Sequence, residues 1–184
     1  MNMFVLAAGN LFTGSFNYAS FTGTVDFGRK YAWTARPSAL KFKYTATVGA
    51  IDMVRTSGDV LEGVAKGDPD NARIFVAIVD WTAPHQVVSG MTTTEGAWDP
   101  GKANTVAEGK IIGYGSLTIP ASESDASDAA LKDTELPIYW YDKTAKPAEG
   151  NYSLVISCAC NAYGDFFTGC SKNTMYVDDF EWVY

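Results

Sequence analysis

The sequence predicts an all-β fold, a jelly-roll β-sandwich of two antiparallel sheets with negligible helix, and three observations lead to it. Aromatic residues make up 14% of the chain and 17 of its 184 residues are glycine, which suits a sandwich better than a helical domain. Several segments alternate apolar and polar side chains with the period of two that is typical of strands. No segment has a persuasive helical pattern, and the chain contains no internal repeat.

The first half of the chain contains the least regular and the most regular of these segments. Short strands are predicted over 4–8 and, interrupted by glycines, over 11–27. The segment 40–48 is the clearest amphipathic strand, because its apolar and aromatic residues alternate with lysine and threonine. The segment 73–80 is apolar on both faces, which predicts a strand in the centre of a sheet.

The second half adds strands over 110–119 and 136–141, and then two long strands over 152–160 and 175–184. A loop rich in glycine and aromatic residues joins these last two strands. The acidic segment 122–133 between the earlier strands is expected to form a loop or one short helix. The interior of the sandwich is predicted to contain Leu40, Phe42, Tyr44, Ile74, Val76, Ile78, Leu154, Ile156 and Phe180.

The size and charge of the chain limit its class. At 184 residues, one domain over 1–184 is the expectation. The net charge of −7 argues against partners such as nucleic acid and anionic membranes. No apolar run has the length that crosses a bilayer, and 1–8 is too short for a signal peptide. The chain is therefore expected to be either intracellular or a mature piece without its targeting segment.

The three cysteines all lie in the last 27 residues. With one histidine and no Cys-x-x-Cys pair, the sequence supports a zinc site poorly. A disulfide between Cys160 and Cys170 is predicted instead, because these two residues enclose a short loop between adjacent strands. Cys158, on the same strand face as Cys160, is the rival partner for Cys170.

Six segments, in a familiar order, carry a resemblance to a known family: AAGNLFTGSF (7–16), RPSALKFKY (36–44), IFVAIVDW (74–81), IIGYG (111–115), YGDFFTG (163–169) and MYVDDFEWVY (175–184). Together they resemble the putative carbohydrate metabolism domain of Bacteroidota lipoproteins, a jelly-roll similar to galactose-binding-like domains and carbohydrate-binding modules. The resemblance implies an extracytoplasmic protein, at the cell surface or in the periplasm, that is associated with glycan use.

The chain departs from that family at its start. Family members usually carry an early strand and a preceding domain before the AAGNLFTG segment, whereas this chain begins almost at that segment. The domain is therefore expected to lack the N-terminal part of the family domain, and a preceding domain of the same protein is a possible partner. The small-residue run before the YGD segment is Cys-Ala-Cys here, which departs from the family's usual residues.

Aromatic residues and acids in two loops form the predicted ligand site. Sugars bind to flat aromatic rings through their C–H faces and to carboxylates and amides through their hydroxyls. If loops 81–109 and 161–174 meet at one rim of the sandwich, they bring together a shallow site for a glycan or oligosaccharide. Its predicted members are Asp80, Trp81, His85, Trp98, Tyr163 and Asp165, with Tyr139 and Asp99 as further candidates at strand ends.

Two other sets of residues have predicted structural roles. Adjacent carboxylates Asp178 and Asp179 point to opposite faces of the last strand, so one is expected to face a buried layer and to need a positive or N–H partner. Arg36, in a segment that the family shares, is expected to be a structural anchor that pairs with a buried carboxylate. By similarity to jelly-roll binding modules, Asp178 and Asp179 are also candidates for one structural calcium ion, the only cofactor expected.

Three functions remain open on the sequence. The first is a non-catalytic carbohydrate-binding module, which the aromatic loops favour. The second is a glycoside hydrolase, which needs two carboxyl groups about 5–10 Å apart; the chain shows no glycosidase signature and no nucleophile elbow, and its only histidine is His85. The third is a structural or adhesive surface module.

Overall fold

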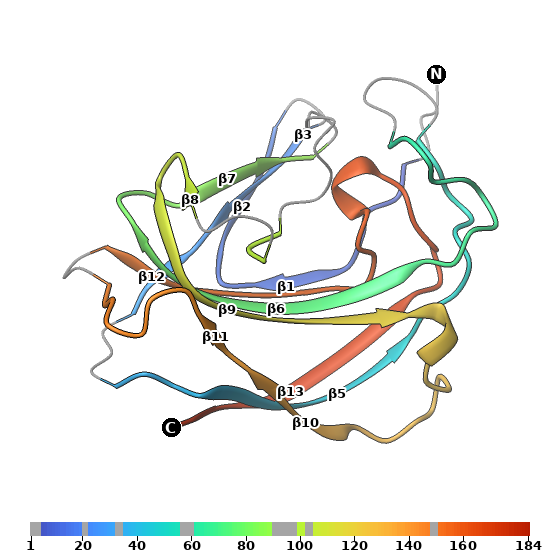
Figure 1. The fold of residues 1–184 in the computed structure, drawn as a ribbon. Coiled ribbons are helices and arrows are strands. Elements are labelled where there is room, and N and C mark those ends of the chain that lie inside the picture. The colour runs from blue at the N-terminus through green and yellow to red at the C-terminus, as the bar shows by residue number, and fades with distance from the viewer. Residues whose placement is uncertain are drawn as a thin grey trace.

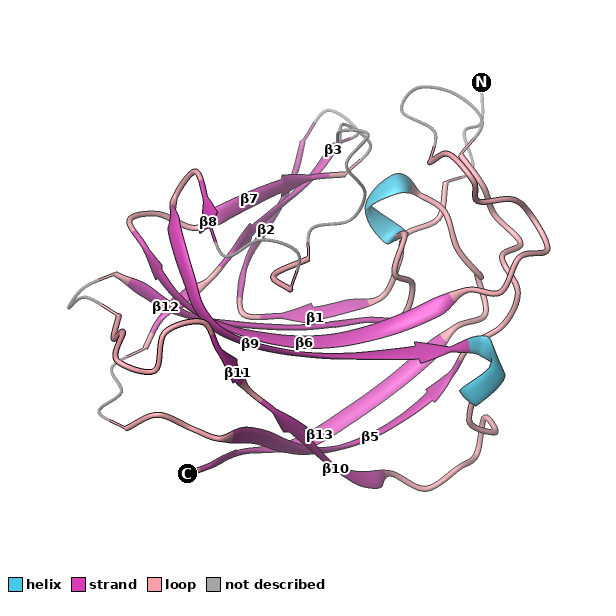
Figure 2. Ribbon diagram, viewed as in Figure 1, coloured by secondary structure: helices cyan, strands magenta, loops and turns pink. Residues whose placement is uncertain are grey.

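Strands of the protein stack in three layers (Figure 1). The computed structural model describes residues 5–19, 22–31, 35–55, 61–89, 99–101, 105–147 and 151–184. Within these residues all strand pairs are antiparallel, and helix is limited to the short 3-10 turns η1 (Ala121–Glu123) and η2 (Gly164–Phe166) (Figure 2). The predicted all-β sandwich is confirmed.

The middle layer, here called the central sheet, has seven strands. Its main path runs in the order β1 (Asn10–Phe12), β12 (Tyr152–Ala159), β6 (Asn71–Trp81), β9 (Gly109–Pro120) and β11 (Tyr139–Trp140). Two short strands extend it, because β4 (Arg29–Lys30) pairs with β12 and β8 (Thr105–Val106) pairs with β9.

A three-stranded sheet covers each face of the central sheet. The back sheet has the order β10 (Lys132–Pro137), β5 (Ala39–Thr47) and β13 (Thr174–Val183). The small sheet has the order β2 (Gly14–Ala19), β3 (Thr22–Phe27) and β7 (His85–Val88). In Figure 1 the small sheet lies above the central sheet and the back sheet below it.

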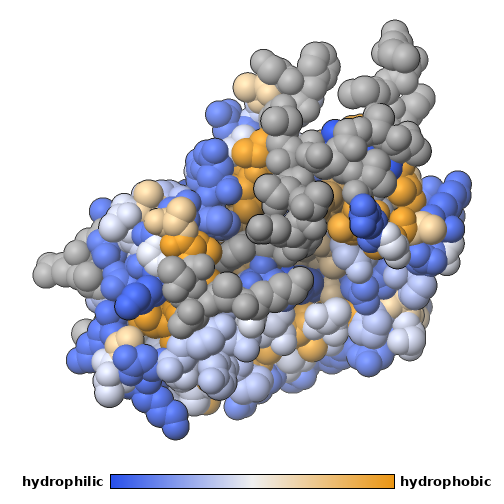
Figure 3. All heavy atoms as spheres, turned by 45° about the horizontal axis from the view of Figure 1, so that its top comes forward, coloured by the Kyte–Doolittle hydropathy of each residue, from blue (hydrophilic) through white to orange (hydrophobic). Residues whose placement is uncertain are grey.

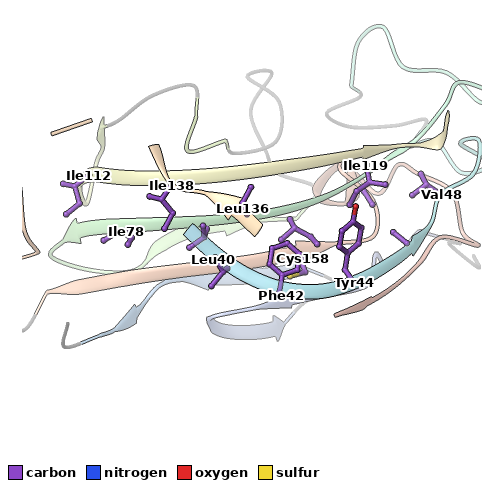
Figure 4. Close-up of a cluster of buried hydrophobic side chains, with 14 residues drawn as sticks. Leu40, Phe42, Tyr44, Val48, Ile78, Ile112, Ile119, Leu136, Ile138 and Cys158 are labelled. Carbon is purple, nitrogen blue, oxygen red and sulfur yellow. The ribbon is translucent and has the colours of Figure 1, made fainter. Parts of the chain in front are cut away.

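The sequence of strand β6 is apolar on both faces because each face packs in a different core. One set of alternate residues, including Ile74, Val76 and Ile78, packs with Leu40 and Phe42 of β5 in the core between the central and back sheets (Figure 4). The other set packs in a second core beneath the small sheet, and it consists of Phe75, Ala77, Val79 and Trp81. A strand buried on both faces cannot alternate in polarity, so the predicted central position of β6 is confirmed.

Most of the predicted interior is found where it was expected. The residues of β5 and β6 in that set are buried, whereas Leu154 and Ile156 are half-buried against the same core. Phe180 is the exception, with 38% of its surface exposed, so its predicted place in the interior is wrong.

Phe180 lies in a β-bulge of β13, where its ring still contacts that of the buried Phe42, with 5.6 Å between the ring centres. Before the bulge, Met175 and Val177, at odd-numbered positions, pack toward the core. The register with β5 shifts between Asp178 and Glu181. After the shift an even-numbered residue, Trp182, packs inward. Asp179 lies in the bulge with a φ of 56°. Both Asp178 and Asp179 are exposed, so the expected buried carboxylate on this strand is also wrong.

Arg36 does not pair with a buried carboxylate among the described residues. Its guanidinium donates a hydrogen bond to the carbonyl of Ala145 at 2.5 Å and lies over the ring of Trp140, 5.6 Å from its centre. None of the residues that the structure describes forms an ion pair with Arg36. The partner expected from the sequence is therefore wrong, because a backbone carbonyl and an aromatic face receive the guanidinium.

The cysteines do not form the predicted disulfide. All three are free thiols, with Cys158 and Cys170 buried and Cys160 half-buried. The sulfur of Cys160 lies beside Gly9, whereas that of Cys170 lies beside Gly49. The Cys160–Cys170 bond is absent because the two side chains pack against different segments.

Candidate functional site

A cavity of about 630 Å³ opens on the part of the central sheet that the small sheet leaves uncovered. It lies between the small sheet on one side and, on the other, the loop that carries η2 together with residues 5–8. Figure 3 brings the upper side of the molecule forward and shows hydrophobic surface there, in orange. A concave, mostly apolar site of this size is typical of small-molecule binding.

The floor of the cavity follows from the alternation of side chains along the central sheet. Arg73 and Phe75 lie on the face of β6 that points to the small sheet, near the start of the strand. Phe75 is at the edge of the second core beneath the small sheet, and Arg73 lies beyond that core. Asn10 and Phe12 of β1 and Ser157 and Ala159 of β12 complete the floor. The floor therefore combines aromatic rings with amide, hydroxyl and guanidinium groups.

Aromatic side chains stand on both sides of this floor. Phe16 and Tyr18, two residues apart on β2, both line the cavity and are 61% and 64% exposed. Phe167 lines the opposite side, where it ends η2 in the left-handed region with a φ of 51°. Exposed aromatic side chains on a strand that faces a cavity are available to a ligand, since folding has not used their surface.

Asp165 is the acid of the cavity. It lies in η2 and is half-buried, and burial raises the pKa of its carboxyl group above the ordinary value. The described part of the chain offers this carboxyl group no hydrogen bond or ion pair. An uncompensated carboxyl group in an apolar cavity is costly, so it is well placed to bond a ligand's hydroxyl group.

Arg73 is the positively charged residue of the cavity, and it already forms an ion pair with an acid. One guanidinium nitrogen lies 2.5 Å from a carboxylate oxygen of Asp99, and Nε donates to the hydroxyl of Ser116 at 3.2 Å. The guanidinium also lies over the ring of Phe75, 5.0 Å from its centre. These contacts fix Arg73 at the floor and compensate its charge.

A buried carboxylate that the sequence did not single out holds the loop of η2 in place. Asp70 has no exposed surface, and its oxygens accept hydrogen bonds from the side-chain amides of Asn161 and Asn173 and from the backbone N–H groups of Asn71 and Cys170. These bonds connect the start of β6 to both ends of the loop that carries Asp165. The available signal was Asp70 in an Asp-Pro-Asp-Asn turn together with asparagines at each end of the later loop.

The predicted rim site is not assembled as a whole. Its first loop follows the end of β6, whereas its second loop follows β12 and begins beside the start of β6. Trp81 pairs with Tyr152, whereas Arg73 pairs with Ala159, just before the second loop. Eight residues of strand separate these positions, which is roughly 27 Å. Asp80, Trp81 and His85 at the far end of β6 therefore do not share a site with Asp165, although Asp99 of the same first loop reaches Arg73.

Residues of the first loop have other roles. Trp81 is fully buried in the second core, so its role as a ligand contact is wrong. Asp80 accepts a hydrogen bond from the side chain of Asn151 at 2.6 Å, and Nδ1 of His85 lies 2.9 Å from a carboxylate oxygen of Glu108. Trp98 lies outside the described residues.

The remaining candidates divide between the cavity and its surroundings. Asp165 lines the cavity, whereas Tyr163, which precedes η2, does not. Asp99 reaches the cavity only through Arg73. Tyr139 is exposed on β11, where its ring packs against those of Tyr114 and Tyr141.

The described residues contain neither a cluster of side chains that could hold a metal ion nor a membrane-spanning helix. No group of three or more His, Cys, Asp or Glu side chains in that part of the chain is placed to hold a metal ion. Asp179 lies 2.7 Å from the ammonium group of Lys43, and Asp178 accepts the backbone N–H of Asp179, so calcium at these residues stays a prediction. Among the described residues, no helix is long and apolar enough to cross a membrane.

Fold and cavity together define a β-sandwich domain with a ligand-sized, aromatic site on one sheet. The chain belongs to the family described as putative carbohydrate metabolism domain, whose model matches residues 1–183. The resemblance seen in the sequence is therefore confirmed. No match is found among curated proteins.

Two solved structures with a similar fold are described as putative glycoside hydrolases. One, from Bacteroides vulgatus, is 20% identical with a TM-score of 0.56, and the match covers 96% of this chain and 64% of that one. The other, from Bacteroides thetaiotaomicron, is 19% identical with a TM-score of 0.52, and the match covers 96% of this chain and 47% of that one. This chain thus spans less than two thirds of either length, and the likeness concerns the fold.

Proposed function

We propose that this domain is a non-catalytic module that binds a carbohydrate in the cavity of the central sheet. The observation that carries the proposal is the pairing of exposed aromatic walls, Phe16 and Tyr18, with Asp165, whose carboxyl group has no partner among the described residues. Aromatic rings bind the C–H faces of a sugar ring, and carboxyl and amide groups bind its hydroxyls. The family's association with carbohydrate metabolism supports the same reading.

Hydrolysis is the second candidate, and Asp165 is the observation that favours it. A carboxyl group whose pKa burial raises has the character of a general acid. Hydrolysis of a glycosidic bond also needs a second carboxyl group across that bond. Asp165 is the only acid among the described residues that line the cavity, and Asp99, which does not line it, forms an ion pair with Arg73. The cavity therefore supports binding better than hydrolysis.

Replacing Tyr18 by alanine tests the proposed site. A glycan array identifies ligands for the wild-type protein, and calorimetry then measures their affinity. Tyr18→Ala is expected to weaken binding about tenfold or more, because a stacked ring is lost. The melting temperature is expected to stay the same, because 64% of this side chain is already exposed.

The matched control is Tyr176→Ala on β13 of the back sheet, a tyrosine that is 61% exposed but remote from the cavity. This variant is expected to bind like the wild type. Equal losses in both variants would place the ligand elsewhere. Each bound glycan is also incubated with wild type and Asp165→Asn; release of product by the wild type alone would replace the binding function with hydrolysis.

A further inference from the structure

The charges around the cavity are unevenly compensated. Arg73 and Asp165 are the only charged residues among the described residues that line it. Arg73 is 13% exposed and already forms an ion pair with Asp99. Asp165, on the other side, receives no hydrogen bond or ion pair from the described chain. The one cation is therefore neutralised, whereas the remaining acid is not.

This imbalance has a consequence for any ligand that carries a negative charge. A carboxylate or sulfate group in the cavity would lie near Asp165 in surroundings of low polarity, where repulsion between like charges is strong. Arg73, whose charge Asp99 already compensates, would offer that group less net attraction than an arginine without an ion pair. A hydroxyl group meets neither obstacle, because it donates a hydrogen bond to the carboxyl group of Asp165.

We propose that Asp165 is a selectivity residue that restricts the cavity to uncharged sugars and excludes uronic acids and sulfated sugars. This inference rests on the proposed carbohydrate-binding function and adds the class of ligand to it. Asp165 acts here through its charge and position in η2, at one side of the cavity, while Phe16 and Tyr18 supply the stacking surface on the other.

Matched oligosaccharide pairs test the proposal. In each pair the two members share stereochemistry and linkage, and they differ only in whether the hydroxymethyl group is oxidised to a carboxylate, as in mannan and mannuronate oligosaccharides. Glucose, galactose and mannose series are measured with wild-type protein and Asp165→Asn at neutral pH. The readout is the ratio of the two dissociation constants within a pair, which general damage to the site does not change.

The wild type is expected to bind the neutral member about tenfold or more tightly than the acidic member. In Asp165→Asn this ratio is expected to fall to about one or two, since the repelling charge is gone. The control is Asp133→Asn, an exposed acid on β10 of the back sheet, which removes the same charge from the whole protein. Its ratio is expected to equal that of the wild type. If Asp165→Asn lowers the melting temperature, Asp165→Ser provides the same comparison.

Failure of this inference differs from failure of the proposed function. A wild-type protein that binds neutral and acidic members equally, or a ratio that Asp165→Asn leaves unchanged, overturns the selectivity role and leaves carbohydrate binding intact. A fall of the ratio in Asp133→Asn would assign the selectivity to net charge and overturn the role of Asp165. A protein that binds none of the glycans overturns both.

Discussion

Asp70 shows how one buried side chain sustains the cavity. It has no exposed surface, and four N–H groups from β6 and from the loop of η2 bond to it. Asp70→Ala would leave these donors without an acceptor in the interior, and the free energy of unfolding is expected to fall by about 3 kcal/mol or more. Urea unfolding measures the change.

Asp68 provides the control, because it is exposed and accepts one backbone N–H, that of Ala65. Asp68→Ala is expected to change the free energy of unfolding by less than about 1 kcal/mol. If both variants lose the same small amount, the bonds to Asp70 do not hold this loop.

Residue-level roles were the hardest to predict from the sequence. Asp165 was proposed as a ligand contact on chemical grounds; the structure places it in the lining of the cavity, and its contact with a ligand stays a prediction. Trp81 was misplaced, because a tryptophan at a strand end looks the same in sequence whether it faces solvent or a second sheet. Arg73 and Phe75 were read as strand interior, since nothing in the sequence shows where the covering sheet stops.

At the scale of elements, the bulge in β13 requires a left-handed backbone conformation at one residue. Asp179 has a φ of 56°, which side chains branched at Cβ strongly disfavour. Asp179→Val is expected to lower the free energy of unfolding by about 1–2 kcal/mol, whereas Asp179→Gly is expected to be nearly neutral. The ion pair with Lys43 that both variants lose is exposed and contributes little.

Chemical denaturation of these variants measures the effect, with Asp178→Val as the neighbouring control. Asp178 is also exposed but does not have a positive φ, so valine there is expected to cost less than valine at position 179. Equal costs at the two positions would show that lost polar contacts, and not the backbone, set the penalty.

The predicted elements were most reliable where burial left a simple pattern. The segment 40–48 alternates because β5 has one buried face, and 73–80 does not alternate because β6 has two. The small sheet escaped prediction because β7 joins β2 and β3 through contacts about 60 residues apart in sequence, as in the pairing of Asp26 with Gln86. The bulge escaped it because two adjacent aspartates fit a regular strand equally well.

At the scale of the whole molecule, two acids are expected to give stability opposite dependences on pH. The backbone N–H of Ala46, followed by Lys132, lowers the pKa of Asp125, so folding favours its ionised form. That stabilisation is present above about pH 4 and disappears as the pH falls through the lowered pKa. Burial raises the pKa of Asp165, so folding favours its neutral form, and a cost appears as the pH rises above about 4.

Unfolding curves of Asp125→Asn and Asp165→Asn from pH 3 to pH 8 check both signs. Near neutral pH, Asp125→Asn is expected to be less stable than the wild type and Asp165→Asn more stable, and both differences are expected to shrink toward about pH 3. A destabilised Asp165→Asn at neutral pH would mean that its carboxylate is stabilised in the folded protein, contrary to the structure.

The small sheet also separates two parts of this molecule, the main core that holds the fold together and the lining of the cavity. Among the described residues, the core between the central and back sheets contains none from β2, β3 or β7, while β2 supplies Phe16 and Tyr18 to one wall of the cavity. Changes in the length or tip of the β2–β3 hairpin would therefore reshape the site without disturbing the interior of the main sandwich. The hairpin is thus a part of this domain that evolution or protein engineering can exchange to change the cavity on an unchanged frame.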